Sequence, residues 1–325
     1  MVIAYSLVFI MIPVMALANK TITQTIHLKA GWNSIFLEVI PDEPDPDILF
    51  KDTPITQVLT IYTNESSVEF IEDPDEVSWK SNTWFRWIPP NAPEALLKTL
   101  HALNENQGYI IYSNDDYTLN IDGQPYIRNR QWQPDAYNLV GFYVDPVAPP
   151  TFAQYFAGSP GHVNLRVFTL IDGIWRQIEK PELENIASGI AYWVYCEGGS
   201  DYSGPLQIKL PGANDYLNFG RTITEWEIDF VNRSPHPLSF TVTPVSTDQD
   251  NETVPLSTIS YTKITLKVYE PFTQTTPPIV METGQSVQLG LAVRRDMIQA
   301  DSVSSLIKIS DDLGNRFFVP VTADK

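Results

Sequence analysis

The sequence predicts a mainly β protein: two tandem small β-rich modules, each with one short helix, followed by an antiparallel β-sandwich. The first observation behind this prediction is local, because short aromatic and β-branched runs alternate with Gly, Pro, Asn and Asp along the chain. The second is an internal repeat in the first two thirds of the chain. The third is a change of composition after Asn214, where the chain becomes rich in Thr, Ser and Val and keeps only Trp226 of its eight tryptophans.

Length, charge and cysteine content limit the class of protein. The 325 residues allow two or three domains, and a hydrophobic fraction of 43% is enough to build a substantial core. The formal net charge is −18, so nucleic-acid backbones and anionic membrane surfaces would repel the chain, and we expect no nucleic-acid partner. Cys196 is the only cysteine, which excludes an internal disulfide framework and multi-cysteine metal sites. It ends an apolar run, so we expect a buried, inert thiol.

The N-terminus has the features of a signal peptide over residues 1–18. The stretch from Met1 to Ala18 has no charged side chain, and small residues stand at Ala16 and Ala18, just before Asn19 and Lys20. The apolar run is too short to span a bilayer comfortably, although a buried N-terminal strand or a membrane anchor are alternatives. We therefore expect an exported protein, periplasmic, cell-surface or extracellular, with no membrane span in the mature chain.

The repeat divides the N-terminal part into module 1, residues 19–128, and module 2, residues 129–212. Gly31-Trp32-Asn33 in the first copy corresponds to Ala136-Tyr137-Asn138 in the second, and each then runs into an acidic or proline-rich loop. The later correspondences, in the same order in both copies, are Val58–Tyr62 with Arg166–Leu170, Trp84–Ile88 with Ile174–Ile178, Gly108–Tyr112 with Gly189–Tyr195, and Tyr117–Gly123 with Pro205–Gly212. Residues 64–82 are an insert in the first copy and are expected to form a surface loop.

Two local patterns are specific enough to predict a turn and a helix. Asp172-Gly173 predicts a type I′ hairpin turn, because both residues tolerate the positive φ angles that this turn requires. The window Glu94 to Leu103 predicts a helix, because its leucines recur at helical spacing and Pro93 stands at a favoured start position.

The opening Gly31-Trp32-Asn33, the later run Gly108 to Tyr112 and the closing turn at Gly123 resemble the Gly-Trp-Asn β-repeat modules of uncharacterised exported bacterial surface proteins. The resemblance covers about residues 28 to 212, and the second copy departs from the pattern at Ala136 and Tyr137. It implies an extracellular module without an assigned catalytic activity.

The sequence pattern of the C-terminal domain, residues 213–325, predicts an antiparallel sandwich. Its expected strands are Trp226–Asn232, Leu238–Val242, Ile264–Val268, Ser286–Val293, Leu306–Ile309 and Phe317–Val321. The pattern resembles the immunoglobulin-like accessory domains of secreted bacterial proteins. Such domains act as spacers or as partner-binding surfaces, and the fold alone does not decide between these roles.

Aromatic residues supply one candidate binding site. Trp79, Trp84 and Trp87 cluster in or beside the insert of module 1, and exposed rings beside carboxylates would suit stacking against sugars. The alternative is that they lie in the core, where small β-modules use large rings to bury area. We expect Trp32, Trp193 and Tyr195 to be core residues.

An acidic loop supplies a second candidate. Asp42, Glu43, Asp45 and Asp47 place four carboxylates within six residues, and calcium, a hard cation, favours oxygen ligands of this kind. The loop lacks a glycine turn and a spaced ligand frame, so a solvated acidic loop is the favoured interpretation. No other cofactor is expected, because the four histidines have no ligand-like spacing.

These observations favour a non-enzymatic exported protein that acts as an adhesion, scaffold or matrix component, with a protein or a glycan at the cell surface as its partner. The alternative is a carbohydrate-binding accessory protein that uses the aromatic residues of module 1. A secreted glycoside hydrolase is a third interpretation, since paired carboxylates are plentiful in so acidic a chain.

Overall fold

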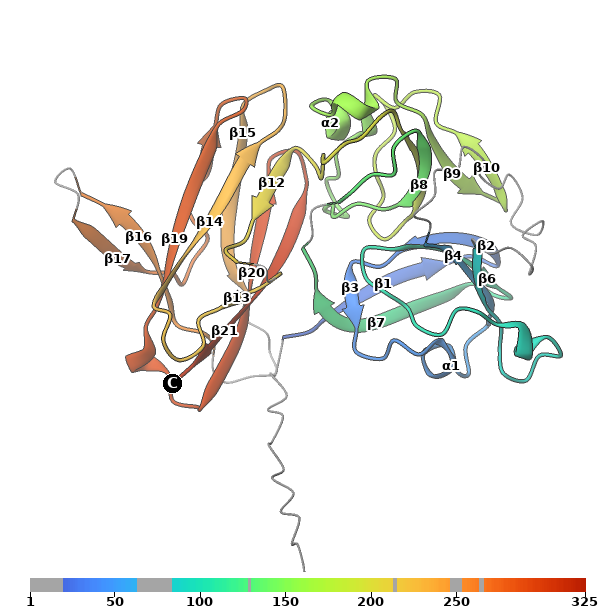
Figure 1. Ribbon diagram of the computed structural model, residues 1–325, viewed down its shortest axis with the longest axis horizontal. Coiled ribbons are helices and arrows are strands. Elements are labelled where there is room, and N and C mark those ends of the chain that lie inside the picture. The colour runs from blue at the N-terminus through green and yellow to red at the C-terminus, as the bar shows by residue number, and fades with distance from the viewer. Residues whose placement is uncertain (1–19, 63–83, 128–129, 213–214, 246–252, 263–265) are drawn as a thin grey trace, which may run out of the picture.

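The computed structural model describes residues 20–62, 84–127, 130–212, 215–245, 253–262 and 266–325. The expected signal peptide, Trp79 and the insert at residues 64–82 lie outside these ranges. The structure confirms the predicted class: two small β-rich modules lie beside each other, and a taller β-sandwich stands next to both (Figure 1). No described helix is long and apolar enough to cross a membrane.

Module 1 consists of two sheets packed on a shared core. The strands are β1 (Ile22–Leu28), β2 (Gly31–Phe36), β3 (Val39–Pro41), β4 (Ile55–Ile61), β5 (Trp84–Trp87), β6 (Gly108–Ser113) and β7 (Tyr117–Pro125). One sheet has the order β2-β6-β4-β5 and the other the order β1-β7-β3. Strand alternation turns Ile35, Val58 and Tyr109 of the larger sheet toward Ile26 and Leu119 of the smaller one, and these side chains are buried in one core.

Module 2 has one sheet covered by a helix and loops. It consists of β8 (Ala136–Val140), α2 (Phe152–Phe156), the 3₁₀ turn η3 (Pro160–His162), β9 (Val167–Ile171), β10 (Ile174–Gln177) and β11 (Tyr192–Cys196), with strand order β10-β9-β11-β8. The core lies between the sheet and α2, where Phe142 packs edge-to-face against Tyr155 and Phe156. Cys196 is fully buried there, as predicted, and burial raises the pKa of its thiol to about 11.

The two modules share one topology. The order β2-β6-β4-β5 in module 1 matches β8-β11-β9-β10 in module 2, strand for strand. The local bonding matches as well: Asn33 Nδ2 donates to Gly31 O at 2.9 Å, and Asn138 Nδ2 donates to Ala136 O at 3.0 Å. In both copies the same Asn side chain also accepts a backbone N–H, from Lys29 or from Gln133, which fixes the entry into β2 or β8.

The structure corrects the alignment of the two copies by one residue in their middle. Val58 pairs with Ile111, and its structural counterpart Val167 pairs with Val194, so Val58 corresponds to Val167 and not to Arg166. By the same registers Trp84 corresponds to Trp175 rather than to Ile174. Short apolar runs match almost equally well in neighbouring registers, and pairing in the sheet decides between them.

The closing strand of the second copy joins the sandwich, so module 2 ends before residue 206 and not at residue 212. In module 1, β7 pairs with β1 and β3, but its expected counterpart β12 (Leu206–Lys209) pairs with the sandwich strand β14 (Glu225–Asn232). A strand with one apolar face can pack against the core of either neighbouring unit, and β12 packs against that of the sandwich.

The expected helix from Glu94 to Leu103 is not formed, and only the 3₁₀ turn η2 (Ala95–Leu97) lies in this window. The backbone N–H groups of Thr99 and Leu100 donate to Arg86 O of the edge strand β5, and these bonds replace the helical ones. Leu100 is buried whereas Leu96 is 97% exposed, so the leucines do not share one face. The short helices of the two modules are instead α1 (Pro46–Leu49) and α2, each directly after the proline-rich loop.

The predicted type I′ turn is confirmed. Asp172 and Gly173 have φ angles of 50° and 78°, and they join β9 to β10 in an antiparallel hairpin.

The two modules pack sheet to sheet through large aromatic rings. Trp193 lies with its ring centroid 6.1 Å from both Trp84 of module 1 and Trp175 of its own sheet. Phe36 packs on Gly141, where a Cβ would lie 2.3 Å from its ring, so glycine is required for this close approach. The larger sheet of module 1 is therefore covered on both faces.

The C-terminal domain is a sandwich of two five-stranded sheets, which confirms the predicted sandwich. The orders are β12-β14-β19-β16-β17 and β13-β21-β20-β15-β18, antiparallel except where β13 runs parallel to β21. The further strands are β13 (Leu217–Asn218), β15 (Leu238–Val245), β16 (Leu256–Tyr261), β17 (Lys267–Pro271), β18 (Ile279–Met281), β19 (Ser286–Val293), β20 (Ser302–Asp311) and β21 (Arg316–Asp324). Stacked Phe230 and Phe240 join the two sheets at the centre of the core.

The turn between β20 and β21 joins the sandwich to module 2 through main-chain hydrogen bonds. Gly314 O accepts a hydrogen bond from Asp145 N at 2.7 Å, and Arg316 N donates to Tyr143 O at 3.0 Å. A Cβ on Gly314 would lie 1.9 Å from Ala148 O, so this turn approaches module 2 closely enough to need glycine.

Inside this turn, buried Asp311 makes folding stability depend on pH. Its carboxylate accepts bonds from Asn315 N and Nδ2, but burial raises its pKa from 3.8 to about 7. The native state therefore holds a proton that the unfolded chain releases, and the free energy of unfolding should fall as the pH rises between 3.8 and about 7.

The Asp311→Asn variant should lose this part of the pH slope. Asn315 Oδ1 is buried without a hydrogen-bond partner, so a rotated Asn315 amide could accept a bond from the new carboxamide. The measurement is the free energy of unfolding between pH 4 and 8, with Asp301→Asn at an exposed carboxylate as control. Equal slopes in the two variants would contradict the assignment to Asp311.

Candidate functional site

The aromatic residues predicted to form a sugar-binding face do not form one within the described residues. Trp87 is 1% exposed, and its Nε1 donates to Asp47 Oδ1 at 2.7 Å, so its prediction as an exposed ring is wrong. Trp84 is half-buried and faces Trp193 across the module interface. The two rings point to opposite faces of β5, and both faces of this sheet are covered, one by the core of module 1 and the other by module 2.

The acidic loop folds around its own carboxylates. Asp45 caps α1 by accepting from Asp47 N at 2.8 Å, and Glu43 accepts from Asp45 N at 2.9 Å. Asp47 forms an ion pair with Lys98, whose hydrogen bond holds the pKa of that carboxyl below its usual range. Burial and then the nearby Asp122 raise the pKa of Asp42. Among the described residues no group of three or more His, Cys, Asp or Glu side chains could hold a metal ion.

We therefore expect calcium to leave the stability of the protein unchanged. The melting midpoint should be the same with millimolar calcium and with a chelator, because three of the four loop carboxylates already have partners within the chain. Asp47→Asn should lower the midpoint equally in both conditions, since it removes the charge that pairs with Lys98. A rise in the wild-type midpoint that requires calcium and is lost in Asp47→Asn would contradict this expectation.

An open cleft that contains a partly exposed aromatic ring lies between the two modules. It has a volume of about 500 Å³ and lies where the β9–β10 turn meets the start of β2. Trp32, expected in the core, is only half-buried and lines this cleft, which corrects the sequence prediction. Trp193 is buried as expected, whereas Tyr195 is half-buried with the Arg166 guanidinium 3.5 Å from its ring centroid.

The cleft combines an aromatic and apolar floor with a polar rim. The Trp32 ring stands edge-on to Tyr112, with centroids 5.1 Å apart, and Leu170 and Ile190 contribute apolar surface. His27, Lys29 and Asp172 are exposed at the rim. This mixture of a flat ring with one cation and one carboxylate suits a neutral ligand that has both apolar faces and hydroxyl groups.

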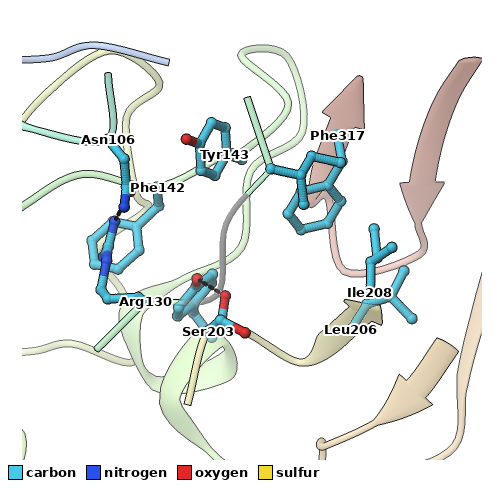
Figure 2. Close-up of a pocket in the computed structure, with 10 residues that line it drawn as sticks. Asn106, Arg130, Phe142, Tyr143, Ser203, Leu206, Ile208 and Phe317 are labelled. Atoms are coloured by element: carbon cyan, nitrogen blue, oxygen red, sulfur yellow. Dashed lines mark hydrogen bonds between the residues drawn. The ribbon is translucent and has the colours of Figure 1, made fainter. Parts of the chain in front are cut away.

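A second, much smaller cavity lies where both modules meet the sandwich (Figure 2). Its volume of about 20 Å³ is room for about one water molecule. Arg130 extends along it and donates to Asn106 Oδ1 at 3.2 Å and to Gly141 O at 2.6 Å, while burial lowers the pKa of its guanidinium. Its planar group also lies 5.3 Å from the ring centroid of Phe142. Arg130 thus bonds to Asn106 of module 1 and to Gly141 of module 2, and the remaining volume is too small for a ligand.

One partly buried contact joins all three units. Glu38 of module 1 accepts a bond from Ser188 Oγ of module 2 at 2.9 Å and lies 3.5 Å from Arg316 Nη2 of the sandwich. Burial raises the pKa of Glu38, although Arg316 acts in the opposite direction. The sequence carries no local signal for this contact, because its members are far apart in the chain.

An open pocket of about 510 Å³ on the sandwich contains the two carboxylates Glu225 and Asp296. Glu225 accepts a hydrogen bond from Tyr269 at 2.6 Å and pairs with Lys267, and the Lys267 bond holds the pKa of Glu225 below its usual range. A glycoside hydrolase needs a carboxylic acid that keeps its proton, so this environment opposes the role of general acid for Glu225.

No protein-family model and no curated protein matches this chain. Among solved structures, the chain is similar to a PapD-like domain of human CEP192 (5% identity, 37% of this chain and 84% of that one, TM-score 0.24). It is also similar to a FixG-related protein from Vibrio parahaemolyticus (11% identity, 37% of this chain and 96% of that one, TM-score 0.24). A third similar structure is the VesB protease of Vibrio cholerae (10% identity, 93% of this chain and 99% of that one, TM-score 0.26). Similarities at these TM-scores carry no information about function.

Proposed function

We propose that this protein is a non-enzymatic exported surface protein that acts as an adhesion, scaffold or matrix component. The contact that supports the proposal is the one between Glu38, Ser188 and Arg316, one residue from each β unit. A spacer must hold its parts in one arrangement, and an ion pair to a buried carboxylate, together with a hydrogen bond, favours a single relative position of the units. The resemblance of residues 28–212 to exported β-repeat modules supports the same class.

Export is tested by expressing the full chain in a bacterial host, with and without residues 1–18. We expect the full chain to leave the cytoplasm and the mature protein to begin at Asn19 in mass spectrometry. A full-length chain that retains Met1 and stays in the cytoplasm would overturn the export part of the proposal.

The scaffold role is tested on the purified mature protein. Small-angle X-ray scattering is expected to fit one rigid arrangement of the three units, and a panel of glycoside, ester and peptide substrates is expected to show no turnover. Scattering that requires several arrangements of the units would contradict a spacer, and turnover that depends on the protein would contradict a non-enzymatic role.

A further inference from the structure

We propose that the cleft between the two modules is a binding site for a neutral oligosaccharide, with Trp32 as its stacking platform. The inference goes beyond the scaffold role and does not depend on it. The cleft volume of about 500 Å³ falls within the range of small-ligand sites in proteins. Its residues come from both modules: Gly31 to Ile35 from one, and Leu170 to Gly173 with Ile190 from the other.

The geometry keeps the Trp32 ring at the cleft. Tyr112, its cross-strand neighbour on β6, stands edge-on to it at an interplanar angle of 75° and limits its rotation. The tight turn at Gly173 lies near the edge of the ring, since a Cβ there would be 3.5 Å from Trp32 Cδ1. A ring fixed in this way offers a flat apolar surface at little entropic cost, which suits the C–H face of a pyranose ring.

Polar groups surround this platform on several sides. β2 is the edge strand of its sheet, and its last residue already bonds to module 2, where Phe36 N donates to Gly189 O at 2.9 Å. Lys29 and Asp172 add one donor group and one acceptor group at the rim, and His27 lies beside them with its Nδ1 3.2 Å from Thr118 Oγ1. Lys29 already pairs with Asp116 at 3.3 Å, so the rim offers an anionic ligand no unpaired lysine, and this favours a neutral ligand with many hydroxyl groups.

The duplicated modules explain why the site is expected only once. Tyr137 occupies the position of Trp32 in module 2, where it packs against Phe168 and Tyr195. The hairpin that forms one wall of the cleft turns within two residues, Asp172 and Gly173, whereas residues 62–83 connect the corresponding strands of module 1. The two copies thus have different surroundings at equivalent positions, and this makes Tyr137 a matched control.

The experiment measures binding of neutral gluco-, xylo-, manno- and galacto-oligosaccharides to the purified protein by calorimetry and by tryptophan fluorescence. At least one oligosaccharide should bind. Trp32→Ala should weaken its affinity at least about ten-fold, whereas Tyr137→Ala should leave it unchanged. If Trp32→Ala fails to fold, the double variant Lys29→Ala with Asp172→Asn replaces it and should also weaken binding. This variant should fold, because Lys29 is exposed and Asn is compatible with the turn.

Several results would overturn the proposal. The first is that none of the four classes of oligosaccharide binds to the protein. The second is an equal affinity of the Trp32 and Tyr137 variants for the sugar. The third is that an extended peptide, and no sugar, binds along β2 in a way that depends on Trp32. The scaffold role would survive each of them, since its tests measure export and rigidity.

Discussion

Trp193→Ala is expected to lower the free energy of unfolding by about 3–5 kcal/mol, the cost of removing a fully packed large aromatic side chain. Trp193 is 2% exposed and contacts Trp84 and Trp175 at the same time, so its loss leaves a cavity between two rigid sheets. Chemical denaturation followed by tryptophan fluorescence and circular dichroism measures the change.

The control for this experiment is Ile174→Ala in the neighbouring hairpin. Ile174 is 52% exposed, and its truncation should change stability by no more than about 0.5 kcal/mol. A Trp193→Ala variant as stable as this control would show that the two modules do not depend on their shared interface.

Arg316→Met should be the second strongly destabilising change, by about 3 kcal/mol, because it leaves the Glu38 carboxylate buried without its cation. Glu38→Gln should cost less, since the amide keeps the Ser188 bond as an acceptor. The double variant should be more stable than the sum of the two single costs implies, and a double-mutant cycle of denaturation curves measures this coupling.

The sign of the pH dependence provides an independent test of this pair. Burial already raises the pKa of Glu38 above 4.5, and loss of Arg316 raises it further. A raised carboxyl pKa means that stability falls as the pH rises from 4.5 through the folded-state pKa. The deficit of Arg316→Met should therefore be larger at pH 7 than at pH 4, and a deficit that is the same at both would contradict a charge-based contact.

Predictions that depend on a few neighbouring residues were confirmed by the structure. The turn at Asp172-Gly173 and the buried Cys196 follow from local conformational preference and from apolar alternation. The repeat was detectable because both copies keep Asn33 or Asn138, whose side chain bonds to its own backbone and so needs no distant partner.

Predictions that require knowledge of the neighbour of each strand were less accurate. The leucines after Glu94 suggested a helix, but the backbone there bonds to Arg86 O, from which it is separated by at least ten residues of chain. Trp87 was predicted as an exposed ring and is buried, whereas Trp32 was predicted in the core and is only half-buried. Hydrophobicity shows that a ring prefers burial, but it does not show which face of a sheet another unit covers. The candidate cleft was missed for the same reason, since its walls come from two modules.

The sequence by itself determined the β content, the duplication, the sandwich and the sharp turns, because these depend on side-chain alternation, glycine and asparagine conformations, and composition over short ranges. Only the tertiary structure decided that β12 leaves module 2 for the sandwich, that both faces of the β2-β6-β4-β5 sheet are covered, and that Trp32 lines a cleft. These features depend on which surfaces meet, and a surface is matched by complementary shape and charge from residues far away in the chain.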